Sequence, residues 1–228
     1  EVDDTDDHSL VVCGPDTQYP DETIHQILFT PDGKEVAVCG VSMTSPTKGE
    51  GFVKFRRISD GKVVKALKLA PKYIQSARFS RDGRWMAAGS CEPSNLWLVR
   101  RGDHTVVRVF ERHIGLRHGY DFTPDSSDLF TCSIRYDVVR HHLKDGTSQV
   151  LPGMKATALL VSPDGRWLLT GYSVATLWRL PSLEKAATFA IPPHGGYGLE
   201  NMTFSPDGNR LIVACDDGIM AWDIIDTP

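Results

Sequence analysis

The sequence predicts an all-β protein built from about five copies of one four-stranded antiparallel unit. The first observation is a phrase of similar residues that recurs five times, with anchors at Phe29, Phe79, Phe122, Val161 and Phe204. The second is its spacing, because successive anchors lie 50, 43, 39 and 43 residues apart. Four short strands with their turns need about 40 to 45 residues, which is the period of a β-propeller blade. The third is the lack of any long amphipathic helical pattern.

Each copy of the phrase predicts a tight turn between two strands. An apolar residue ends one strand, and a Ser/Thr-Pro-Asp-Gly tetrad follows, with one substitution in the second and third units. Proline presets φ, aspartate bonds back to the turn backbone, and glycine takes the positive φ. We therefore interpret five aspartates as turn formers and not as metal ligands: Asp32, Asp82, Asp125, Asp164 and Asp207.

The residues around each turn predict the strands. An apolar or apolar-bodied side chain stands two residues before each anchor and a mixed set one residue before, which indicates a strand with one face in the core. The tenth residue after the anchor is always small: Cys39, Gly89, Cys132, Gly171 and Ala214. A third strand carries Trp97, Trp178 or Trp222. A fourth strand runs through Val63–Leu69, Thr105–Phe110, Ser148–Leu151 and Lys185–Ile191. In the first unit, Met43–Gly51 is expected to be a long polar loop.

These motifs resemble the WD-repeat β-propeller family over almost the whole chain from Ile24. The best match is FSPDGNRLIVACDDGIMAWDI, which contains the Trp222-Asp223 dipeptide that names the family. The other units depart from the pattern, because Trp97 precedes leucine, Trp178 precedes arginine, and the first and third units lack the tryptophan. The chain is therefore identified as a divergent, bacterial-looking member with an incomplete hydrogen-bond tetrad. The resemblance implies a β-propeller of about five four-stranded antiparallel blades.

The fifth unit has room for three strands, and the apolar run Ser9–Val12 can supply the fourth. In the resembled family an N-terminal strand commonly completes the last blade and leaves no bare edge. This count predicts a five-bladed ring formed by residues 9–228 as one domain, after an acidic lead-in at residues 1–8. A slice of a larger ring stays the alternative, because most family members have seven blades and the chain begins at Glu1.

Composition and charge exclude several classes of function. The chain has 228 residues, 41% of them hydrophobic, and a net charge of −4. It therefore has no basic field to hold nucleic acid or an anionic membrane, and its apolar runs are too short to span a bilayer. Five cysteines without a CxxC pair indicate reduced thiols. We expect a cytoplasmic protein, with a removed signal left open by the missing initiator methionine.

The sequence contains no signature of a known catalytic or cofactor site. It has no GxSxG elbow, no GxxxxGK[ST] loop and no GxGxxG turn between a strand and a helix. We therefore expect no cofactor, no metal and no enzyme activity. The alternative is a metal-assisted, lactonase-like hydrolase at the channel mouth, for which Asp121, His118 and His194 are the candidate ligands.

The loops at one rim are the candidate binding surface. In the resembled family, the connections between blades and the loops between second and third strands share this rim. Tyrosine and arginine are enriched at interface hot spots, and these loops hold Tyr73, Arg117, Arg135, Tyr136, Tyr172 and Tyr197. We predict a monomeric, non-catalytic interaction or scaffold module of a larger multidomain protein, which binds a protein or peptide partner there. A structural spacer without a partner is the remaining alternative.

Overall fold

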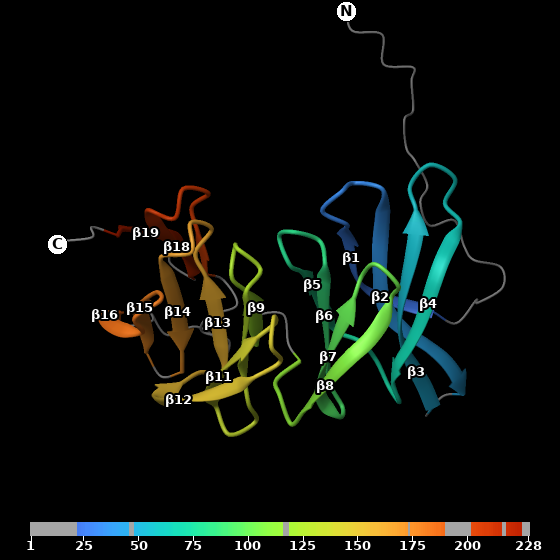
Figure 1. The fold of residues 1–228 in the computed structure, drawn as a ribbon, viewed down its shortest axis with the longest axis horizontal. Coiled ribbons are helices and arrows are strands. Elements are labelled where there is room, and N and C mark those ends of the chain that lie inside the picture. Colours follow the sequence, from blue (N-terminus) through green and yellow to red (C-terminus); the bar gives the residue numbers. More distant parts are fainter. Residues whose placement is uncertain are drawn as a thin grey trace, which may run out of the picture.

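The computed structural model describes residues 22–45, 48–115, 119–172, 174–189, 202–215 and 218–224. These residues form five antiparallel sheets and contain no helix. The sheets succeed one another in sequence order across the molecule, from the first sheet in blue to the fifth in red (Figure 1). The described part of the chain thus has no helix that could cross a membrane. The all-β prediction is confirmed, and we call the sheets blades one to five.

Blades one to four contain four strands each, and the described part of blade five contains three. Blade one is β1 (Glu22–Phe29), β2 (Glu35–Ser45), β3 (Lys48–Arg57) and β4 (Val63–Ala70). Blade two is β5 (Ser76–Phe79), β6 (Trp85–Cys91), β7 (Ser94–Arg100) and β8 (Thr105–Glu111). Blade three is β9 (Tyr120–Phe122), β10 (Asp128–Cys132), β11 (Asp137–His142) and β12 (Ser148–Lys155). Blade four is β13 (Ala158–Val161), β14 (Trp167–Gly171), β15 (Ala175–Arg179) and β16 (Glu184–Phe189). Blade five is β17 (Met202–Phe204), β18 (Arg210–Cys215) and β19 (Gly218–Asp223).

Within each blade, the spatial order of the strands is their order in the sequence, so every neighbouring pair is a hairpin. The predicted closing strand Ser9–Val12 and the acidic lead-in lie outside the described residues. The expectation of a long polar loop at Met43–Gly51 was wrong. Strands β2 and β3 continue to Ser45 and Lys48, and Met43 pairs with Gly49, so the segment forms an extended hairpin.

The five repeated turns are built as the sequence predicts. Each turn aspartate accepts a hydrogen bond of 2.5–2.7 Å from the Ser or Thr hydroxyl two residues before it. It also accepts the backbone N–H two residues after it, at 3.0–3.2 Å. Glycine has a positive φ in four turns, and Ser126 takes this conformation in blade three. The aspartates are therefore occupied by their own turns.

Apolar clusters between neighbouring blades form the core. Phe55 of β3, for example, packs with Met86 and Trp97 of blade two in one such cluster. One of the predicted small residues, Gly89, lies at a close contact, because a Cβ there would stand 2.3 Å from the carbonyl oxygen of Gly115. Burial raises the pKa of the Cys39 thiol to about 12, so this cysteine is an unreactive packing residue.

Candidate partner-binding rim

The connections between blades and the loops between second and third strands meet at one rim, because the strands alternate in direction. Backbone hydrogen bonds of 2.7–2.9 Å join the two kinds of segment in two places, Ile134 to Arg112 and Ala156 to Tyr136. Two further bonds join a connection to a second strand, Gln75 to Gly89 of β6 and Thr157 to Gly171 of β14. Since their backbone groups are paired, these loops form a fixed support for the side chains that they expose.

Two of the predicted binding residues lie against each other at this rim. Tyr136 is in the β10–β11 loop of blade three and Tyr172 is in the β14–β15 loop of blade four. Their ring centroids are 5.1 Å apart at an interplanar angle of 46°. The two residues remain 40% and 53% exposed, respectively. The rings therefore form an aromatic surface that crosses the junction of two blades.

The backbone of Tyr136 is in a conformation that bulky residues rarely adopt. Its φ is +67°, in the left-handed region that favours glycine or asparagine. Such a conformation costs about 1–3 kcal/mol and persists where the surroundings enforce it. Here Tyr136 N–H donates to the carbonyl of Ser133 at 2.8 Å, and the Ser133 hydroxyl accepts from the backbone of Arg135 and Asp137. The loop thus holds an exposed tyrosine at a position where a smaller residue would cost less conformational free energy.

Apolar and cationic side chains surround the tyrosine pair. Ile134 and Val174 are exposed in the same two loops. Arg135 is exposed beside them. Arg112 is also exposed; it lies at the start of the connection between blades two and three, and its carbonyl accepts from Ile134 N–H. Neither arginine forms a salt bridge within the described residues. We call the whole surface the tyrosine patch, which comprises Arg112, Ile134, Arg135, Tyr136, Tyr172 and Val174.

Tyr73, the one further predicted residue that the structure describes, is not in this patch. Tyr73 is half-buried at the junction of blades one and two, where its ring meets the edge of His25 at a centroid distance of 5.7 Å. Arg117 and Tyr197 lie outside the described residues. Sequence reasoning missed Arg112, Ile134 and Val174, although each stands in or next to a loop that the strand pattern places at this rim.

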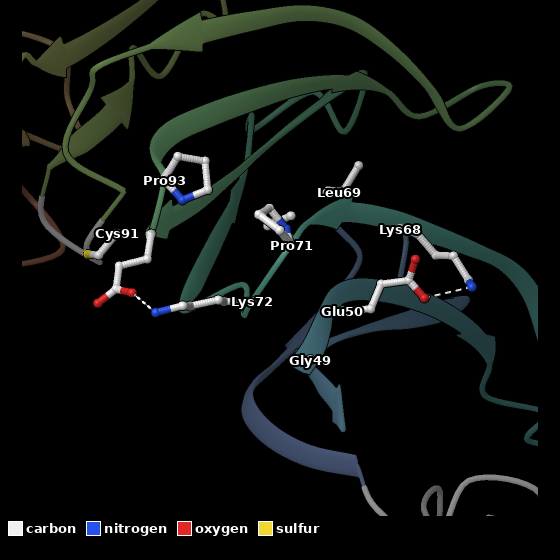
Figure 2. Close-up of a pocket in the computed structure, with 10 residues that line it drawn as sticks. Gly49, Glu50, Lys68, Leu69, Pro71, Lys72, Cys91 and Pro93 are labelled. Atoms are coloured by element: carbon white, nitrogen blue, oxygen red, sulfur yellow. Dashed lines mark hydrogen bonds and ion pairs between the residues drawn. The ribbon is translucent and has the colours of Figure 1, made fainter. Parts of the chain in front are cut away.

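A cleft opens at the same rim between blades one and two. It has a volume of about 1020 Å³, and Leu69, Pro71 and Pro93 contribute to its apolar walls. Figure 2 shows two ion pairs at its sides, Glu50 with Lys68 and Lys72 with Glu92. Both pairs are exposed, and such pairs contribute little to stability. The cleft can therefore accept an extended segment without the loss of a strong internal contact.

The structure does not assemble the metal site of the hydrolase alternative from the residues that it describes. Asp121 accepts hydrogen bonds of 2.9 Å from Arg78, from Phe122 N–H and from Val161 N–H. Its carboxylate is therefore already paired. His118 and His194 lie outside the described residues. Among the residues that are described, no group of three His, Cys, Asp or Glu side chains is placed to hold a metal ion.

Comparison with known proteins finds one family model that matches part of the chain and a solved structure with the same fold. The model described as "WD domain, G-beta repeat" matches residues 187–223, from the end of blade four through β19. No curated protein matches the sequence. A similar solved structure is the β-propeller domain of Cps50 (Swd1) from Myceliophteria thermophila, with a TM-score of 0.68 and 17% identity. The match covers 90% of this chain and 66% of that chain. The chain thus spans slightly less than two thirds of that structure and shares its fold.

Proposed function

Because this chain carries a WD40 repeat and has the β-propeller fold, we propose that it is a non-catalytic module that binds a protein or peptide through the tyrosine patch. WD40 propellers typically act as protein-interaction scaffolds. We also propose that the module is monomeric and belongs to a larger multidomain protein. A propeller suits this role because rigid blades support loops that are free to carry contacts.

The observation that carries the proposal is the exposed pair Tyr136 and Tyr172. Tyrosine supplies a large contact area with few rotatable bonds, and it is enriched among interface hot spots. Folding alone would favour asparagine or glycine at position 136, because of the positive φ there. Retention of an exposed aromatic residue at a strained position is typical of functional sites.

The test is selection of binding peptides on the full chain. A phage-displayed library of random short peptides is selected on the immobilised protein, and the binders are then measured on Tyr136→Asn and Tyr172→Asn. We expect each substitution to weaken binding by roughly tenfold, the loss typical of a hot spot. Val107→Thr is the matched control, since Val107 is exposed on β8 and outside the patch.

Stability measurements keep this test free of folding artefacts. Tyr136→Asn relieves the backbone conformation, whereas Tyr172→Asn does not, and both remove the same ring contact. We therefore expect Tyr136→Asn to melt at least as high as Tyr172→Asn while both lose binding. Peptides that bind both variants as tightly as the wild type would show that the patch is not the binding site.

A further inference from the structure

We infer that the partner presents an acidic segment, in which carboxylates meet Arg112 and Arg135 and a neighbouring apolar side chain lies on Tyr136 and Tyr172. This inference rests on the proposed function, because it names the chemistry of a partner for the same patch. It adds a requirement for negative charge that the tyrosine pair alone does not impose.

The two arginines are held close together by the fold. The carbonyl of Arg112 accepts the backbone N–H of Ile134 at 2.9 Å, and Arg135 is the next residue. Arg112 itself has a φ of +59°, so it is a second residue of the patch in the left-handed region. The loops thus bring the backbones of two exposed arginines together beside the loop that carries Tyr136.

No acid forms a salt bridge with these arginines within the described residues. Asp137 is the first residue of β11, two residues after Arg135, and its carboxylate accepts from Lys155 Nζ at 2.5 Å. Glu111 precedes Arg112 in the chain, at the end of β8, but forms no salt bridge within the described residues. The other described ion pairs at this rim join Lys68 with Glu50 and Lys72 with Glu92, near blades one and two.

Charge complementarity therefore selects the partner. Arg112 and Arg135 form no salt bridge within the described residues, so the patch offers two positive charges to a partner. Opposite charge on the partner attracts it to the patch and favours correct docking. Guanidinium groups also bind carboxylates through two parallel hydrogen bonds.

The apolar members of the patch exclude a purely ionic ligand. Ile134 and Val174 are exposed next to the tyrosines, and these side chains gain binding free energy only when a partner removes them from water. An acidic peptide that also carries a leucine or an aromatic residue satisfies both parts of the surface. Duplex DNA offers negative charge without such a side chain and is the less complementary ligand.

The experiment compares three peptide libraries displayed on phage, with the full chain as the bait. All three contain fixed leucine and tyrosine positions, and the intervening positions are Asp/Glu, Asn/Gln or Lys/Arg. We expect the acidic library to be enriched over the others, and its enrichment to fall roughly tenfold in the double variant Arg112→Gln/Arg135→Gln. The enrichment should also fall as salt is raised. Arg84→Gln is the control, because Arg84 is exposed in the repeated turn of blade two, at the opposite rim.

The outcomes separate this inference from the proposed function. Equal enrichment of the neutral library, or acidic enrichment that survives the double arginine variant, overturns the acidic partner. If those peptides still lose binding in Tyr136→Asn, the proposed function stands without it. If no library binds in a tyrosine-dependent way, the proposed function fails as well. Tighter binding of a short DNA duplex than of the acidic peptides also overturns the inference.

Discussion

At the scale of single residues, blade three shows how a buried histidine can replace a tryptophan. His141 lies in the third strand, where blades two, four and five carry Trp97, Trp178 and Trp222. Its Nε2 is 2.9 Å from the Thr131 hydroxyl, and its Nδ1 is 2.7 Å from the Ser148 hydroxyl. Trp178 makes a comparable bond in blade four, donating from Nε1 to Thr170 at 2.8 Å. The histidine therefore preserves an internal hydrogen bond and adds a titratable group.

This histidine makes stability depend on pH. His141 is 3% exposed, and burial, with the nearby positive charges of His113, Arg108 and His142, lowers its pKa from 6.5 to about 3. As pH falls below 6.5, the unfolded chain binds a proton that the folded chain does not, so the free energy of unfolding decreases. We expect a loss of about 2 kcal/mol between pH 7 and pH 5 from this group.

The measurement is urea unfolding of the wild type and His141→Gln at both pH values. Glutamine keeps hydrogen-bonding groups but does not titrate, so its variant should lose less stability on acidification. Burial also lowers the pKa of His113, and a smaller dependence of the same sign should therefore persist. An equal loss in both proteins would show that His141 does not govern the acid response.

At the scale of elements, the repeated turn is the unit that defines each blade. Gly208 in the blade-five turn has a φ of +73°, and an added Cβ would stand 2.5 Å from the Asp164 carboxylate of blade four. We expect Gly208→Ala to lower the free energy of unfolding by about 1 kcal/mol or more. Gly102→Ala is the matched control, because nothing lies within 4 Å of a Cβ there. The melting temperatures of both variants are measured by thermal unfolding. Equal melting temperatures would contradict this account.

The turns and strands could be predicted because their determinants are local. A Ser/Thr-Pro-Asp-Gly tetrad contains both its hydrogen-bond partners and its left-handed residue, so the sequence alone identifies five hairpins. The Met43–Gly51 segment was misjudged because its polar composition hides a strand extension, which pairing between β2 and β3 stabilises. Tertiary pairing here overrides a weak local preference.

The candidate site could be predicted only in part, because it depends on contacts between blades. The strand pattern placed Tyr136 and Tyr172 in rim loops, but their ring contact depends on the junction of blades three and four. Arg112 joins the patch through a backbone bond to Ile134, which is remote in sequence. Tyr73 fits the same pattern, yet its ring covers the junction of blades one and two beside His25.

At the scale of the whole molecule, neighbouring blades are joined by more than their apolar faces. Asp121 of β9 bonds to Arg78 of β5 and to the backbone of Val161 in β13. One buried carboxylate therefore connects the first strands of blades two, three and four. Because each blade mainly contacts its neighbours (Figure 1), we expect such links to couple the blades in a single unfolding transition.

Removal of this carboxylate should weaken that coupling. Asp121→Ala removes the acceptor of one Arg78 N–H and of two backbone N–H groups, and loss of one member of a buried pair costs about 3–5 kcal/mol. Arg78 is partly exposed, so water offsets some of this cost, and we expect the lower end of that range. The denaturant dependence of unfolding should also become shallower, as expected when blades cease to unfold together.

Glu50→Ala provides the contrast, because it breaks the exposed ion pair with Lys68 at the rim and should leave the urea midpoint nearly unchanged. The comparison distinguishes a carboxylate that joins three blades from one that forms only an exposed ion pair. If both variants unfold at the wild-type midpoint, the coupling between blades resides in their apolar clusters alone. If Asp121→Ala instead unfolds in two steps, the junctions of blade three are where the propeller separates first.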